Sequence, residues 1–274
     1  VLFRSDVTCT LELKFLFLKM TNSKDPNKES LAEIAVDPDV LAKELALEVE
    51  IDPLEEIDED AFSKDLNITQ ECSEALKMLK GNREERIHGL RIFCEYRDQR
   101  SFPLLLPLLD QPCPVERMSA VYALGRNPCP KAVQKLVSLL ETDDNAYVRR
   151  ATAWSLANYH NQIVLEPLIN ALKNDVAAVR LWSSSSLAEI GNVSLENAQL
   201  AAEQLLISLK IDNESGVRSN CIWSLCRLYE KLNNIFQESF VDECTKIALF
   251  DKEPSVMEEA KTALDSMGMQ GFYN

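Results

Sequence analysis

A block of nine residues recurs six times along this chain of 274 residues, and the recurrence limits the folds that the sequence can adopt. The first block reads ERIHGLRIF and the third reads VRRATAWSL. Its last position is Leu or Phe, and its second is Arg in every block but the last, which has Met257. The blocks begin about 31 to 39 residues apart, at Glu85, Glu116, Val148, Val179, Val217 and Val256. A period of this length predicts an array of similar structural units.

Each block follows an apolar stretch with helical spacing, such as AVQKLVSLL or AAEQLLISLK, and then a short polar turn. The turn carries an aspartate in the five later units: Asp110, Asp143 or Asp144, Asp175, Asp212 and Asp251. A carboxylate there can cap the free N–H groups of the following helix. The pattern predicts an all-α fold, an α-solenoid in which about six helix pairs form a superhelix. Each pair is a first helix, an acidic turn and a second helix.

Three segments are expected along the chain. Residues 1–19 are predicted to be a non-native or disordered leader, because VLFRS resembles a translated sequencing adapter and Met20 is the expected start. Residues 20–66 hold 15 acidic and 4 basic residues and are predicted to be partly disordered, with a portion covering the first end of the array. Residues 67–274 form the helical repeats.

The offset of a residue within its block predicts its surroundings. Counting the first residue as offset 0, offsets 0, +4, +7 and +8 share one side of a helix at about 100° per residue. We expect the large residue at +8 to fill the core beside small residues at +4 and +7. The arginines at +1 are Arg86, Arg117, Arg149, Arg180 and Arg218. We predict that they form a structural ladder with the turn residues Asp110, Asp143, Asp175, Asp212 and Asp251, since a guanidinium fork suits carboxylates. An anion-binding stripe is the disfavoured alternative.

Offset +6 points about 140° away from the centre of the core side. If the second helices line a concave wall, Tyr122, Trp154 and Trp223 at this offset project into the groove as recognition anchors. The alternative is that each ring packs against the second helix of the neighbouring repeat. The other candidate binding residues on this face are Arg91, Arg126, Asn158 and Arg227.

Composition narrows the classes of function. The formal charge of −15, without a basic stripe, disfavours nucleic acid as a partner and favours a basic protein surface. The eight Cys are scattered and the two His lie in different repeats, so we expect no metal site and a cytoplasmic chain with free thiols. LELKFLFLKM is too short and too charged to span a membrane. No nucleophile–base arrangement or Gly-rich phosphate loop is recognisable.

Helix pairs of this period, with an aspartate turn followed by Val-Arg, resemble HEAT repeats over residues 69–268. The blocks VRRATAWSL and VRLWSSSSL are similar to those of the cyanobacterial phycobilisome-lyase HEAT-like subgroup. The resemblance implies two functions. The expected one is a non-enzymatic, cofactor-free scaffold that holds another protein on its concave face, such as a phycobiliprotein or other photosynthetic subunit, in light-harvesting complex assembly or turnover. The alternative is a bilin lyase or lyase subunit, commonly heterodimeric, that attaches a tetrapyrrole to phycobiliprotein cysteines. A third interpretation is a chaperone-like holder of partly folded subunits.

Overall fold

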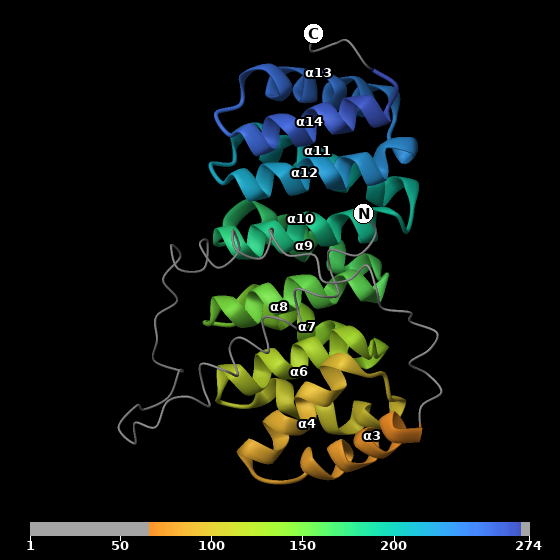
Figure 1. Cartoon of the computed structure of the whole chain (residues 1–274), viewed down its shortest axis with the longest axis vertical. Coiled ribbons are helices and arrows are strands. Elements are labelled where there is room, and N and C mark those ends of the chain that lie inside the picture. The colour runs from red at the N-terminus through yellow and green to blue at the C-terminus, as the bar shows by residue number, and fades with distance from the viewer. Residues whose placement is uncertain (1–65, 270–274) are drawn as a thin grey trace. The chain divides into compact units, whose positions relative to one another are not determined.

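The computed structural model describes residues 66–269, which form two compact units with their boundary between Tyr159 and His160 (Figure 1). The expected leader at residues 1–19 and the expected cover of the first end, within residues 20–66, lie outside the described residues but for Leu66. Within them, no helix has the length and apolar character needed to cross a membrane.

Unit 1 contains three helix pairs. The first pair is α3 (Leu66–Met78) with α4 (Arg83–Glu95). The second is α5 (Phe102–Leu105), continued by the 3-10 segment η3 (Leu106–Asp110), with α6 (Pro114–Arg126). The third is α7 (Val133–Thr142) with α8 (Ala146–Leu156). Short 3-10 turns connect them: η2 (Gln99–Ser101), η4 (Pro130–Ala132) and η5 (Ala157–Tyr159).

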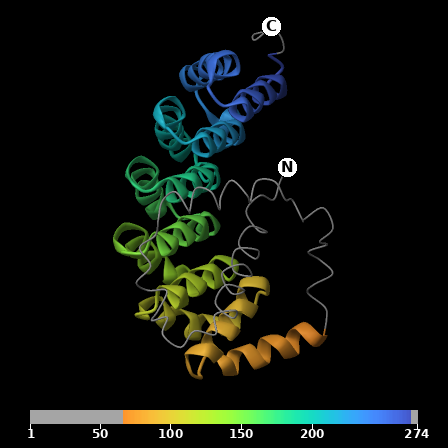
Figure 2. The same cartoon turned by 60° about the vertical axis from the view of Figure 1, so that its left-hand side comes forward.

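Unit 2 contains three further pairs: α9 (Leu165–Asn174) with α10 (Ala177–Gly191), α11 (Leu195–Ile211) with α12 (Ser215–Leu228), and α13 (Asn234–Phe250) with α14 (Pro254–Ser266). The 3-10 segments η6 (Gln162–Val164) and η7 (Tyr229–Lys231) precede α9 and α13. Within this unit, the first helices form one layer and the second helices another, and Figure 1 shows α10, α12 and α14 in front. The second view separates the two helices of each pair (Figure 2). The described residues are therefore all helical repeats without strands, which confirms the predicted fold class and the six pairs.

The predicted core positions +4 and +8 are confirmed in both units, whereas in the first repeat Glu85 at offset 0 is exposed and Ile92 at offset +7 is half-buried. The residues at offset +8 are 0% exposed: Phe93, Leu124, Leu156, Leu187, Leu225 and Leu264. The residues at offset +4 are also buried, and at Gly89 a Cβ atom would lie only 2.9 Å from the carbonyl oxygen of Ala75. Small side chains at +4 therefore let the paired helices approach closely while the large residue at +8 fills the space.

The expectation that the turn aspartates cap the second helices is wrong. Asp143 is the C-cap residue of α7, and its Oδ1 accepts the amide N–H of Asn145 at 2.9 Å. Asn145 is itself the N-cap of α8, and its side chain accepts the amides of Tyr147 and Val148. The Asp143 carboxylate therefore stabilises the turn by accepting a backbone amide two residues further along, as in an Asx turn. The cap of the second helix is supplied by Asn145 instead.

Candidate functional site

The arginines at offset +1 join successive repeats. In unit 1, Arg117 Nε donates to Asp143 Oδ2 at 2.8 Å and its Nη2 donates to Asp143 Oδ1 at 2.9 Å. Its Nη1 donates to the carbonyl oxygens of Gln111 and Pro112 in its own turn. One guanidinium therefore binds its own turn and the turn of the following repeat, with the bidentate geometry that makes such pairs strong.

Unit 2 repeats this arrangement twice. Arg180 binds both carboxylate oxygens of Asp212 at 2.7 Å, and Arg218 binds those of Asp251 at 2.7 and 2.9 Å. The Nη1 groups donate to the carbonyls of the preceding turns, at Asp175 for Arg180 and at Asp212 for Arg218. The hydrogen bonds with the carboxylates raise the pKa of Arg117 and Arg180. These arginines are thus engaged in the framework and do not form the anion-binding stripe considered from the sequence.

The other two ladder arginines also bind the turn before their own helix. Arg149 Nη1 donates to the carbonyls of Asp143 and Asp144, and Asp175 Oδ1 accepts the amide of Val176. Arg86 binds Glu116, which is buried and lies outside the predicted ladder, at 2.7 Å.

Asp110 was predicted to belong to the ladder, and this is wrong. Its carboxylate is exposed and pairs with Lys135. Ladder aspartates are the C-cap residues of first helices, whereas Asp110 is the last residue of η3 and the C-cap is Gln111. Asp110 therefore lies one residue short of the ladder position.

Two of the three aromatic residues predicted to line a groove are buried. Tyr122 is 3% exposed and Trp154 is 5% exposed, and their ring centroids lie 5.4 Å apart at an interplanar angle of 58°. The indole also covers Gly125, where a Cβ atom would lie 2.3 Å from Trp154 Cζ3. Because α6 and α8 pack side by side, the residue at offset +6 of one helix contacts the next helix. These two rings are core residues of unit 1, which is the alternative raised from the sequence.

In unit 2 the residues at the same offset are less buried: Ser185 and Trp223 are half-buried and Thr262 is exposed. We define the second-helix face by the residues at offsets +2, +6 and +10 of α10, α12 and α14, all of which are half-buried or exposed: Leu181, Ser185, Glu189, Ser219, Trp223, Arg227, Glu258, Thr262 and Ser266. Trp223 lies in the middle of this face. No other ring occupies offset +6 on either neighbouring helix, because α10 has Ser185 and α14 has Thr262.

Arg227 and Glu189 complete a cluster around Trp223. The guanidinium carbon of Arg227 lies 5.0 Å from the centroid of the Trp223 ring, and Arg227 Nη2 donates to Glu189 Oε1 at 2.7 Å. The side chains of Arg227 and Glu189 are 29% and 35% exposed. The cluster thus combines an accessible indole with a cation held over it by a carboxylate on the adjacent helix.

Polar side chains hold the two helices of this cluster together. Asn220 Nδ2 donates to Ser185 Oγ at 2.7 Å and to the carbonyl of Leu181 at 3.2 Å. Ser224 Oγ donates to the carbonyl of Ser184 at 2.8 Å. The platform that carries Trp223 is therefore fixed by hydrogen bonds as well as by packing.

The other predicted binding residues are not part of this cluster. Arg91 and Arg126 are half-buried residues of unit 1, in α4 and at the end of α6. Asn158 is exposed in the 3-10 segment η5, after α8 has ended. Glu189 was not predicted, although it occupies the same offset in its block as Arg227 and could have been found from that equivalence.

The described cysteines are poor candidates for nucleophiles or metal ligands. Burial raises the pKa of Cys226 to about 12 and also raises the pKa of Cys94, Cys221 and Cys244, so their thiolates are disfavoured at neutral pH. Over residues 66–269, no group of three or more His, Cys, Asp or Glu is placed to hold a metal ion.

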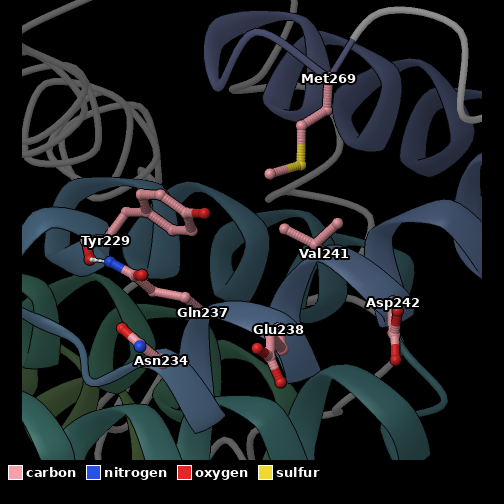
Figure 3. A pocket seen from close by; sticks show the side chains of 7 residues that line it. All are labelled: Tyr229, Asn234, Gln237, Glu238, Val241, Asp242 and Met269. Carbon is pink, nitrogen blue, oxygen red and sulfur yellow. Dashed lines mark hydrogen bonds between the residues drawn. The ribbon is translucent and has the colours of Figure 1, made fainter.

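A cavity of about 200 Å³ lies beside the first half of α13 and is lined by Tyr229, Asn234, Gln237, Glu238, Val241, Asp242 and Met269 (Figure 3). Gln237 closes one side by donating to the carbonyl of Tyr229 at 2.9 Å. Pockets for small molecules have volumes of about 300–1,000 Å³. The second-helix face is therefore the better candidate site.

Comparisons with known proteins agree with this architecture. A family model described as HEAT repeats matches residues 73–157 and 133–226, which together are more than half of the chain. A designed armadillo repeat protein in complex with the peptide (KR)4 is similar in structure, with a TM-score of 0.51, 19% identity, and coverage of 73% of this chain and 98% of that chain. An engineered protein gives a TM-score of 0.50 at 20% identity and covers 85% of this chain and 99% of its own. At these identities the structural likeness shows the fold alone.

Proposed function

Because the chain belongs to the HEAT-repeat family, we propose that it is a non-enzymatic scaffold that binds a protein partner on the second-helix face of unit 2. The observation that carries this proposal is the cluster of Trp223, Arg227 and Glu189. Trp and Arg are enriched among the residues that dominate binding energy in protein interfaces. A half-buried indole on helices held by hydrogen bonds loses little conformational entropy when a partner covers it.

The charge of the chain indicates the chemistry of the partner. Residues 160–274, which form unit 2, hold 16 acidic and 9 basic residues, and the second-helix face carries the carboxylate of Glu258 as well as the paired Glu189 and Arg227. A partner segment rich in Lys or Arg would gain both from this field and from stacking its side chains on Trp223. The designed armadillo repeat protein, whose fold is similar, is in complex with the basic peptide (KR)4. We therefore propose a basic peptide segment as the ligand.

A light-harvesting context is a narrower proposal that rests on the sequence resemblance to the phycobilisome-lyase subgroup. Under it, the partner would be a phycobiliprotein or another photosynthetic subunit. The lyase alternative is supported by one feature, because the Trp223 ring on the second-helix face could stack on a flat tetrapyrrole. Co-expression with a bilin and an apo-phycobiliprotein tests it: covalent pigment transfer that depends on this chain would replace the scaffold proposal.

Titration of the full chain with a fluorescently labelled (KR)4 peptide at low salt tests the scaffold proposal. Replacing Trp223 by Ala is expected to weaken binding by about thirtyfold, since a truncated hot-spot aromatic typically costs at least about 2 kcal/mol. The matched control is Phe250→Ala, which removes an 80% exposed ring at the end of α13 in the first-helix layer. Equal effects of the two substitutions, or none from either, would contradict the proposed site.

A further inference from the structure

Arg227 is held less completely than the two ladder arginines of unit 2. Arg180 and Arg218 each bind both oxygens of a carboxylate through Nε and Nη2, at distances of 2.7 to 2.9 Å. The ion pair of Arg227 joins Nη2 to Glu189 Oε1 at 2.7 Å, and its Nε is buried without a hydrogen-bond partner among the described residues. A buried donor without an acceptor is unfavourable. The cluster around Trp223 therefore holds a guanidinium that it satisfies only in part.

The other two residues of the cluster form a site that suits a guanidinium. The Trp223 ring, whose centroid lies 5.0 Å from the guanidinium carbon of Arg227, supplies a flat aromatic surface. Glu189 on the neighbouring helix α10 supplies a carboxylate. A planar guanidinium stacks on an indole and pairs with a carboxylate at the same time, whereas the ammonium group of lysine is a compact point charge. The site therefore favours arginine over lysine.

The Arg227 side chain has an alternative position on its own helix. Arg227 lies in the last turn of α12, where the main-chain carbonyl oxygens and the helix dipole favour a cation. The side chains of Arg227 and Glu189 are 29% and 35% exposed, so a ligand reaches both from solvent. Rotation of the Arg227 side chain toward the end of α12 would uncover Trp223 and Glu189 without moving a helix.

We propose that Arg227 occupies, in the free chain, the position of an arginine side chain of the partner, and that binding displaces it. The partner's guanidinium then stacks on Trp223 and pairs with Glu189, while Arg227 turns toward the end of α12. Arg227 keeps Glu189 paired in the free chain and competes with the partner, so it limits the affinity of the site. This inference rests on the proposed binding of a basic segment to the second-helix face.

Titration of the full chain with labelled (KR)4 and with labelled octalysine tests the displacement. Arg227→Met removes the competing guanidinium and keeps a long apolar side chain. We expect it to tighten (KR)4 binding by about tenfold, because the site is then no longer occupied in the free chain. Octalysine binding should tighten by less than about threefold, since an ammonium gains less from the stacking site. Lys261→Met is the matched control, because it removes one positive charge from the adjacent helix α14 and should change either affinity by less than about twofold.

Two further variants separate competition from the loss of a positive charge. Arg227→Lys keeps the charge but removes the planar group, so competition predicts tighter (KR)4 binding than in wild type. In the Arg227→Met background, Glu189→Gln removes the carboxylate that the partner's arginine would use, and it should cancel the gain in affinity. Thermal unfolding of each variant establishes that the repeats are intact.

The outcomes distinguish the displacement from the binding function. If Trp223→Ala weakens (KR)4 binding but Arg227→Met leaves it unchanged or weakens it, the displacement is overturned and the binding site stands. If (KR)4 binds neither wild type nor Arg227→Met, the proposed binding function fails and the displacement fails with it. Equal gains in affinity from Arg227→Met and Lys261→Met would also overturn the displacement, because they would show an effect of net charge alone.

Discussion

Arg117 of α6 forms a two-pronged salt bridge with Asp143, the residue that ends the first helix of the next repeat. The same guanidinium binds the carbonyls of the turn before its own helix. One side chain therefore fixes the register between two successive repeats, and Arg180 and Arg218 do so in unit 2.

Breaking this pair should destabilise the fold. The side chain of Asp143 is only 2% exposed and that of Arg117 is 17% exposed. Replacing Arg117 by Ala leaves a buried carboxylate without its main partner, so we expect the free energy of unfolding to fall by about 2–3 kcal/mol. Lys135→Ala is the control because it breaks the exposed pair with Asp110 and should change stability by less than about 1 kcal/mol. Urea denaturation measures both, and equal losses would contradict a structural role for the ladder.

Trp154 and Trp223 should behave oppositely although their blocks are alike. Trp154 is 5% exposed, so its replacement by Ala should cost about 3–5 kcal/mol of folding stability. Trp223 is only half-buried, and its replacement by Ala should cost clearly less, about 1–2 kcal/mol. Thermal unfolding of the two variants tests this contrast. A larger loss for Trp223→Ala would show that its ring serves the core.

The contact between Gly125 and Trp154 gives a coupled prediction. A Cβ at position 125 would lie 2.3 Å from the indole, so Gly125→Ala should destabilise the protein by about 1–3 kcal/mol despite the better helix propensity of Ala. In a Trp154→Phe background the smaller ring leaves room, and the same substitution should be nearly neutral. A double-mutant cycle measures this coupling. Additive losses would mean that the two residues do not compete for space.

Acidification should weaken the last rung of the ladder. Burial alone would raise the pKa of Asp251, but hydrogen bonds from Arg218 and the Glu253 amide hold that pKa below its ordinary value. A folded-state pKa below the unfolded value of about 3.9 means that the carboxylate stabilises the fold above about pH 4. The contribution is lost as the pH falls through the folded-state pKa. The difference in the free energy of unfolding between wild type and Asp251→Asn should therefore be largest at neutral pH and become smaller in acid, as urea denaturation at several pH values would measure. A difference that grows in acid would contradict this assignment.

The fold could be predicted from the sequence because the buried position at offset +8 requires a large apolar residue in every repeat. The recurrence of residues such as Leu156 and Leu187 at this offset is visible in the sequence alone. The ladder was predictable in outline, but Asp110 lies one residue before the ladder position, and Arg86 binds the buried Glu116 of the following helix instead. Hydrogen-bond geometry at a turn, which the residue type alone does not give, decides this difference.

The error at Tyr122 and Trp154 has a different cause. A helical wheel treats a helix as having one buried side, whereas α6 also packs beside α4 and α8 in the same layer. The neighbouring side chains then decide exposure. Trp154 meets Gly125 and Tyr122, while Trp223 lies between helices with Ser185 and Thr262 at the same offset.

Iodide quenching of tryptophan fluorescence most directly tests whether the partner covers Trp223. The chain has three Trp residues, and Trp154 and Trp182 are 5% and 9% exposed, so quenching reports mainly on Trp223. We predict that saturating (KR)4 peptide, or a natural partner captured by the full chain, lowers the quenching constant of the wild type to nearly that of the Trp223→Phe variant. A bound partner that leaves iodide quenching unchanged would place binding elsewhere and contradict the proposed function of the second-helix face.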